Sequence, residues 1–267
     1  MARSPLGSRE YYHRHLPHQV PKGVPLFVTW NLKGSLPQAA WTELEYERAR
    51  LDREPYRAGE SREERKRRID KMLFVRRDHV LDMATSGPLW LKDGIAAQIV
   101  VDRILSGART SGFSLTGSQD NPSPEPDAGK VSLKPAVRGE QRYELFAHCV
   151  MANHVHVLLK PKWELKDLMQ GIKGFTSFRI NRLQNARGRT FWQDESYDHW
   201  CREEQEFFRI IEYIERNPVA AGLCASPEDW PWSSARWRPA WKLGVAFRLE
   251  FLPADDQQRL LAAWQSK

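Results

Sequence analysis

The chain has 267 residues, of which 41 are Lys or Arg and 34 are Asp or Glu, and its formal net charge is +7. A chain of this length can bury a full core without disulfides, and its three separated cysteines, Cys149, Cys201 and Cys224, include no Cys-x-x-Cys pair, which argues against a disulfide framework and structural zinc. No apolar run is long enough to cross a membrane and the first residues lack a signal-peptide core, so we expect a soluble cytoplasmic protein whose arginine-rich positive charge favours nucleic acid as a partner.

The first part of the chain is predicted to contain one strand followed by helices. Residues 25–32 are rich in β-branched and aromatic side chains and precede a Lys-Gly-Ser turn, which indicates a strand. Residues 38 to about 83 are heavily charged and indicate helix, in which the basic run 62–68 is most simply a solvated face. A further helix is predicted from Asp93, its N-cap, to residues 106–107. Its inward side chains are expected to be Ile95, Ile99, Ile104 and Leu105.

Residues 106–139 have a different composition, dominated by Ser, Gly, Pro and Thr with few large apolar side chains. Such a segment cannot bury enough apolar surface to offset the entropy of ordering its backbone. We therefore expect a flexible insertion here, within a domain that spans residues 1–236. Residues 237–267 are expected to form a C-terminal extension.

The second half of the chain is predicted to complete a sheet. Two strands there are separated by a tight turn near Ala152 and Asn153, which predicts an antiparallel hairpin, and Pro218 is expected to stop the last helix. The elements predicted here are strands at 142–150, 154–160 and 196–201 and helices at 164–185 and 203–217. With the first half, the order is β-α-β-β-α-β-α. This order is typical of a ferredoxin-like α+β fold, an antiparallel sheet with helices packed on it.

Two histidines, His154 and His156, alternate with valines at the start of the predicted strand 154–160. Because successive side chains of a strand point to opposite faces, both imidazoles project from one face while the valines pack on the other. Imidazole nitrogen is a strong ligand for divalent cations, so the pair is a candidate metal site. Considered alone, such a pair is more often two ordinary polar histidines.

On the last predicted helix, Tyr213 and Asn217 lie one turn apart on the flank of its apolar stripe, and both can reach the edge of the sheet. A phenol with a pKa of about 10 is a poor nucleophile in water, but a divalent cation that polarises a phosphodiester makes its attack on phosphorus feasible. Asn217 could supply a carbonyl oxygen to that cation. Helical periodicity alone favours plainer roles, a half-buried aromatic residue and a polar residue before proline.

Four motifs follow one another in the order of a known family. They are Met-Ala-Asn-His-Val-His-Val-Leu-Leu at 151–159, Trp-Gln-Asp-Glu-Ser-Tyr-Asp at 192–198, Tyr-Ile-Glu-Arg-Asn-Pro-Val-Ala-Ala-Gly-Leu at 213–223 and Trp-Pro-Trp-Ser-Ser-Ala at 230–235. With them the chain resembles the single-tyrosine HUH transposases, and more narrowly their REP-associated tyrosine transposase branch, from about residue 17 to about residue 236. One departure is Ala152, where the family commonly has proline, and we expect it to affect only the rigidity of the turn.

The resemblance implies a role for each matching position. His154 and His156 correspond to the metal-binding pair, Tyr213 to the nucleophile and Asn217 to the third metal ligand, with Mg²⁺ or Mn²⁺ as the cation. The implied activity is that of a metal-dependent endonuclease and strand transferase that cuts single-stranded DNA through a 5′-phosphotyrosine intermediate. The implied partner is palindromic hairpin DNA, the repetitive extragenic palindromes of the bacterial nucleoid. The resemblance leaves both a monomer and a homodimer open.

A basic group late in the chain is a candidate for contacts with the DNA backbone and, equally, for solvated surface: Arg179, Arg182, Arg187 and Arg189. Two other functions are open. A domesticated hairpin-binding protein with little or no strand transfer would keep the basic surface and make Tyr213 dispensable. A histidine-triad nucleotide hydrolase also has alternating histidines on a strand, but Leu158 occupies the next position on that face, and His148, on the preceding strand, has no matching register.

Overall fold

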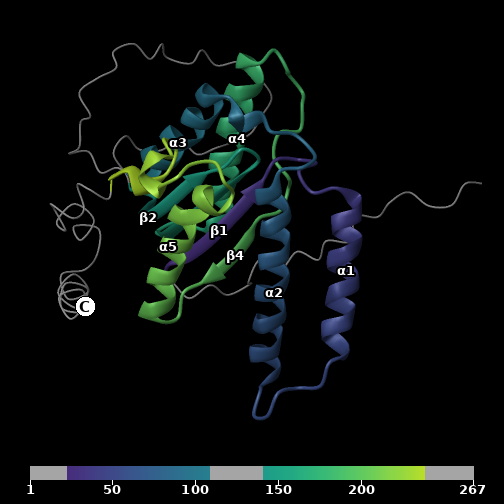
Figure 1. Ribbon diagram of the computed structural model, residues 1–267. Helices are drawn as coiled ribbons and strands as arrows, with labels where there is room; N and C mark the ends of the chain where they lie inside the picture. The colour runs from purple at the N-terminus through teal and green to yellow at the C-terminus, as the bar shows by residue number, and fades with distance from the viewer. Residues whose placement is uncertain (1–22, 109–140, 238–267) are drawn as a thin grey trace, which may run out of the picture.

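The computed structural model describes residues 23–108 and 141–237 and shows a four-stranded antiparallel sheet with helices on both faces (Figure 1). The strands lie in the order β2-β3-β1-β4, and each neighbouring pair is antiparallel. The elements are β1 (Leu26–Asn31), α1 (Gln38–Arg53), α2 (Arg62–Met83), α3 (Gly94–Ala108), β2 (Tyr143–Val150), β3 (His154–Pro161), α4 (Leu165–Leu183), β4 (Tyr197–Trp200) and α5 (Glu204–Ala220). This order and connectivity confirm the predicted ferredoxin-like α+β fold.

The expected insertion and the expected C-terminal extension lie almost entirely outside the described residues. Residues 106–108 belong to α3, and the rest of the predicted insertion falls in the range 109–140, which the structure does not describe. The description ends at residue 237, the last residue of a short 3-10 helix. Within the described ranges, no helix combines the length and the apolar composition that crossing a bilayer requires.

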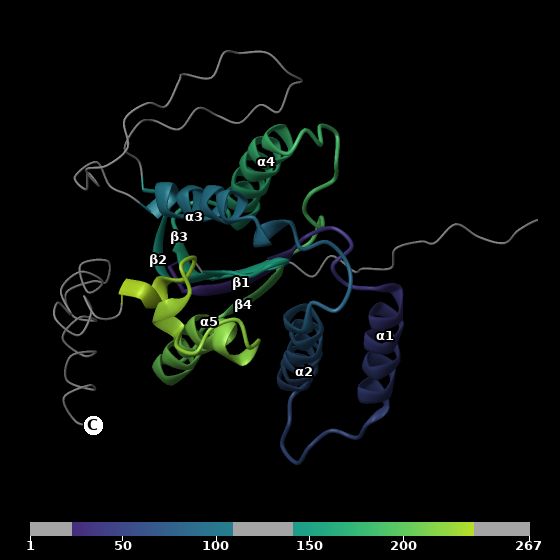
Figure 2. The ribbon, with the colours of Figure 1, turned by 45° about the horizontal axis from the view of Figure 1, so that its top comes forward.

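Strand alternation divides the core into two layers. On β1, Leu26, Val28 and Trp30 point into the layer that α3 and α4 cover. Phe27, between them, points into the opposite layer, where it packs with side chains of α2 and α5. Figure 2 shows α3 and α4 on one side of the sheet and α5 and α2 on the other. The Phe27 ring is stacked against that of His156, so the histidine pair lies on the face that α2 and α5 cover.

The helices α1 and α2 form a hairpin in the connection between β1 and α3, in addition to the helices that the ferredoxin-like order requires (Figure 1). α2 begins with a capping box in which Ser61 and Glu64 each accept a hydrogen bond from the other's backbone N–H. The basic run at the start of α2 is not wholly solvated, because the Arg65 guanidinium is buried and donates to the backbone oxygens of Leu51 and Asp52. These bonds tie the two helices of the hairpin together.

Two predicted details of the helices are wrong. α5 continues through Pro218 to Ala220, because a proline close to a helix end removes only one hydrogen bond there. Ile95 is exposed and not inward, since α3 faces the core with the fully buried Ala96 and Ala97.

Candidate metal and nucleophile site

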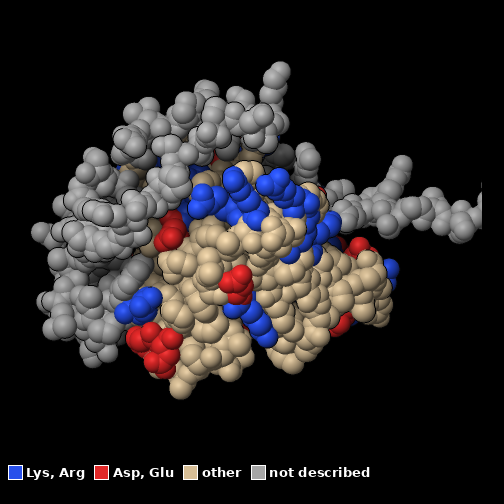
Figure 3. Space-filling model, turned by 90° about the horizontal axis from the view of Figure 1, so that it is seen from above, with Lys and Arg blue, Asp and Glu red and all other residues tan. Residues whose placement is uncertain are grey.

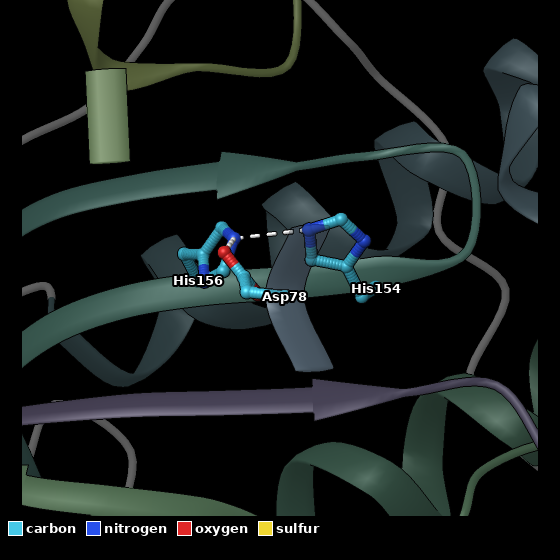
Figure 4. A group of neighbouring side chains, drawn as sticks. All are labelled: Asp78, His154 and His156. Carbon is cyan, nitrogen blue, oxygen red and sulfur yellow. Dashed lines mark hydrogen bonds and ion pairs between the residues drawn. The ribbon is translucent and has the colours of Figure 1, made fainter. Parts of the chain in front are cut away.

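The two imidazoles of β3 lie side by side in the core. His154 and His156 are fully buried and stand opposite Asn31 and Thr29 of β1, respectively. Their Nε2 atoms are 2.9 Å apart (Figure 4). The strand alternation expected from the sequence therefore brings two imidazole nitrogens to one point.

Hydrogen bonds on the far side of each ring orient these nitrogens. Asn153 donates from Nδ2 to the Leu81 backbone oxygen over 2.9 Å, so its Oδ1, 2.7 Å from His154 Nδ1, must accept the ring N–H. His154 Nε2 is therefore left with a lone pair that points into the site. On the other ring, His156 Nδ1 lies 2.8 Å from the Thr29 hydroxyl. A ring nitrogen held in this way is typical of metal-binding histidines.

Burial keeps both rings neutral. Desolvation lowers the pKa of His154 well below its ordinary value, with smaller contributions from the neighbouring His156 and the positive charge of Arg77. Desolvation and the same arginine lower the pKa of His156 to about 3. Neutral imidazole is the form that binds a cation, so both rings are ready as ligands at neutral pH.

Two aspartates of α2, which the sequence reasoning did not single out, complete the group. Asp78 Oδ2 lies 3.6 Å from His156 Nε2, and Asp82 Oδ1 lies 3.4 Å from His154 Nε2. Ligand atoms of Asp78, His154 and His156 all lie within 4.8 Å of one another (Figure 4). The available signal was their spacing, since residues four apart share a helix face. This spacing did not distinguish the two aspartates in the sequence, because α2 contains many charged residues.

Both aspartates are costly to ionise without a cation nearby. Burial raises the pKa of Asp78 well above its ordinary value, the negative charge of Asp82 raises it further, and Arg77 opposes both effects. Burial raises the pKa of Asp82 to about 7, against a hydrogen bond from Asn217 that lowers it. A bound divalent cation would favour the ionised forms. Two neutral imidazoles with a buried carboxylate form a mixed nitrogen and oxygen donor set that could hold a divalent metal ion.

Tyr213 and Asn217 approach the same group from α5. The Tyr213 hydroxyl donates a hydrogen bond to Asp78 Oδ2, and its ring meets that of His156 edge-on, with the centroids 5.7 Å apart. Asn217 is buried beside Asp82, and its Oδ1 has no hydrogen-bond partner among the described residues. The structure thus brings together the four residues that the sequence singled out for metal binding and nucleophilic attack.

A hollow of about 270 Å³ opens beside the tyrosine. It is lined by Asp82, Arg209, Glu212, Tyr213, Arg216, Asn217 and Ala220. Arg209 and Arg216 are exposed, and they stand four residues before and three residues after Tyr213, on the same side of α5. Arg216 is ion-paired with Glu212 over 3.3 Å, so an anionic group that entered the hollow would meet the Arg209 guanidinium and a paired Arg216 next to the phenol.

The four arginines singled out from the sequence, on α4 and in the segment after it, lie on the α4 side of the sheet, opposite the histidine pair. Figure 3 views the molecule from above and shows Lys and Arg side chains gathered on that side. Arg189 is engaged within the chain, because it donates to Asn181 and Gln184 and stacks over the Trp90 ring at 3.9 Å. The exposed members of the group are Arg179, Arg182 and Arg187.

The position of a third histidine, which a histidine-triad hydrolase requires, is occupied by an apolar side chain. Leu158, the next residue of β3 on the site face, is buried in the apolar layer with Phe27. His148 pairs with Val157 on β3, so it points to the opposite face of the sheet. The geometry does not support that alternative.

Part of the chain is similar to known proteins. Residues 133–217 match the family described as Transposase IS200 like. Over 102 residues the chain is 28% identical to the REP-associated tyrosine transposase of Escherichia coli (strain K12), and this match covers 37% of the chain and 58% of that relative. A solved structure of a REP-associated tyrosine transposase bound to a REP hairpin superposes with a TM-score of 0.40 and 14% identity, over 88% of this chain and 86% of that one.

Proposed function

We propose that this chain, whose residues 133–217 match the family described as Transposase IS200 like, is a metal-dependent endonuclease and strand transferase for single-stranded hairpin DNA. One observation carries the proposal. The Tyr213 hydroxyl is hydrogen-bonded to Asp78, a residue whose carboxylate also lies within 4.8 Å of the paired Nε2 atoms of His154 and His156. A potential nucleophile and a potential cation site are therefore adjacent.

His154, His156 and Asn217 would hold the cation, with Mg²⁺ or Mn²⁺ as the candidates. The two Nε2 atoms are 2.9 Å apart, so one divalent cation could contact both imidazoles. When bound, the cation would polarise the scissile phosphodiester and offset the charge that develops on it.

Tyr213 would act as the nucleophile. Its oxygen forms a bond to phosphorus as the bond from phosphorus to the 3′ oxygen breaks, and the phenolic proton is passed on overall to that 3′ oxygen. The DNA is left with a 5′-phosphotyrosine link and a free 3′-OH. Because the phosphodiester energy is kept in this link, a 3′-OH can attack it and rejoin DNA without ATP. Arg209 and Arg216 are placed to bind phosphates beside the phenol.

The proposed substrate is hairpin DNA of the repetitive extragenic palindrome type, by analogy with the similar transposases. Such DNA offers phosphates for positioning and exposed bases for recognition. Arg179, Arg182 and Arg187 are exposed and remain candidates for backbone contacts. Arg189 is the weaker candidate, because its guanidinium is already bonded and stacked within the chain.

The test is a denaturing gel of labelled single-stranded hairpin DNA incubated with the protein and Mn²⁺. The wild type should form a covalent protein–DNA band, and Tyr213→Phe should not. Tyr46→Phe is the matched control, because Tyr46 is an exposed tyrosine of α1, and it should behave like the wild type. Retained hairpin binding without any covalent band, over a panel of hairpins, would instead support a protein that only binds DNA.

A further inference from the structure

The helix α2 lies outside the segment that matches the transposase family, yet it contributes two carboxylates to the candidate site. We propose that Asp78 links the cation to the nucleophile: one carboxylate oxygen binds the divalent cation and the other holds the Tyr213 hydroxyl. This role depends on the function proposed above. It adds to that site an anionic ligand, and a positioning residue for the tyrosine, that neither the sequence motifs nor the family match assigns.

The two oxygens of Asp78 have different surroundings. Oδ2 accepts the Tyr213 hydrogen bond and lies 3.6 Å from His156 Nε2. Oδ1 is buried and has no hydrogen-bond partner among the described residues. A buried carboxylate oxygen without a partner is costly, and a cation shared with the two imidazole Nε2 atoms would supply that partner. A carboxylate has enough acceptor positions for a cation and a hydroxyl at the same time.

Contacts on both sides of Asp78 hold it in place. One residue earlier, Arg77 donates from Nη2 to Asn31 Oδ1 on β1 over 2.6 Å. Three residues later, the Leu81 backbone oxygen accepts from Asn153. One turn earlier, the Phe74 ring meets Phe27 edge-on, with the centroids 5.3 Å apart. The helix is therefore fixed to the sheet around the aspartate, as a precisely placed ligand requires.

The second aspartate supports the same arrangement. Asp82 Oδ1 lies 3.4 Å from His154 Nε2, and Asp82 lines the same hollow as Asn217, whose buried Oδ1 has no hydrogen-bond partner among the described residues. Both side chains therefore border the candidate cation site.

Mn²⁺ binding by the full chain without DNA, followed from the free Mn²⁺ signal in electron paramagnetic resonance, tests the metal part. Asp78→Asn keeps the shape of the side chain and removes its charge, and it should weaken Mn²⁺ binding about tenfold or more. Asp70→Asn is the control: it removes a charge from the same helix, about 12 Å away along the axis, where Asp70 pairs with Arg48. The control should bind Mn²⁺ like the wild type.

The rate of covalent adduct formation at saturating Mn²⁺ and saturating hairpin DNA tests the positioning part. Asp78→Asn should lower this rate about tenfold or more without changing the affinity for the hairpin. Thermal unfolding of the metal-free variants checks that Asp78→Asn is folded, and added Mn²⁺ should raise its Tm less than that of the wild type.

The outcomes separate this inference from the proposed function. If His154→Ala abolishes Mn²⁺ binding while Asp78→Asn binds Mn²⁺ and forms adduct like the wild type, the role of Asp78 is refuted and the proposed function stands. If the wild type binds no Mn²⁺, or His154→Ala binds it equally well, the proposed site itself is refuted and this inference with it. If Asp78→Asn loses both Mn²⁺ affinity and adduct rate while Asp70→Asn keeps them, the inference is supported.

Discussion

The Tyr213 hydroxyl on α5 donates a hydrogen bond to Asp78 on α2, and one helical turn further along both helices Asn217 and Asp82 line the same hollow. The two helices thus meet through matching pairs four residues apart. The residue with the candidate nucleophilic hydroxyl and the residue with the candidate ligand oxygen each contact one aspartate. A change on α2 should therefore alter the chemistry of α5 even where it leaves the histidine pair untouched.

Replacement of Asn217 should show whether its oxygen is a ligand. Asn217→Ala is expected to weaken Mn²⁺ binding about tenfold, since it removes a buried oxygen without a hydrogen-bond partner. Asn217→Asp should bind Mn²⁺ more tightly than the wild type, while its metal-free form should unfold at a lower temperature because the new carboxylate faces Asp82. Calorimetric titration with Mn²⁺ measures the affinities. Equal affinity in Asn217→Ala and the wild type would remove Asn217 from the ligand set.

Asn153 should affect the Mn²⁺ affinity although it is not itself a proposed metal ligand. Its Oδ1 accepts the His154 Nδ1 hydrogen bond and so fixes the ring orientation. Asn153→Ala is expected to weaken Mn²⁺ binding by about 10- to 100-fold, the usual range for such orienting partners. Gln98→Ala, an exposed change on α3, serves as the control and should leave the affinity unchanged. An unaltered affinity in Asn153→Ala would show that strand geometry alone orients the ring.

Replacement of Phe74 should lower both the stability of the fold and the Mn²⁺ affinity of the site. Its buried side chain packs against Phe27 and stacks on Tyr197 with the centroids 4.2 Å apart. Phe74→Ala is expected to lower the free energy of unfolding by about 3 kcal/mol and to weaken Mn²⁺ binding, because α2 loses its main apolar contact with the sheet. The neighbouring Val75 is exposed, and Val75→Ala should change stability by less than about 0.5 kcal/mol. Chemical denaturation with and without Mn²⁺ measures both effects.

Asp198 on β4 should make stability depend on pH. Desolvation raises its pKa to about 7, and both its carboxylate oxygens are buried without a hydrogen-bond partner among the described residues. Between pH 4 and 7 the folded state therefore binds more protons at this residue than the unfolded state, so its contribution to stability falls as the pH rises through this window.

Asp198→Asn has no ionisable group at this position, so this residue should no longer lower the stability as the pH rises. Its Tm should exceed that of the wild type by an amount that grows from pH 4 to pH 7 and then levels off, and the difference in stability should reach at most about 4 kcal/mol. Melting curves across this range, without added metal, measure it. A difference in Tm that does not change with pH would mean that the carboxyl group titrates normally.

Much of the site follows from local periodicity. The two-residue repeat of a strand places His154 and His156 on one face, and the helical repeat places Tyr213 and Asn217 one turn apart. The order of the elements was enough to predict the ferredoxin-like sheet. Each of these conclusions concerns residues close in sequence or the simple succession of elements, for which the pattern of apolar and polar side chains carries the information.

Only the tertiary structure showed that α2 covers the site. Its sequence is charged throughout and lacks a clear apolar stripe, so nothing local indicated that Asp78 is buried. The contact between Asp78 and Tyr213 joins residues 135 positions apart. Local periodicity determines which side chains of one element share a face, but the packing of distant elements in three dimensions decides which faces meet.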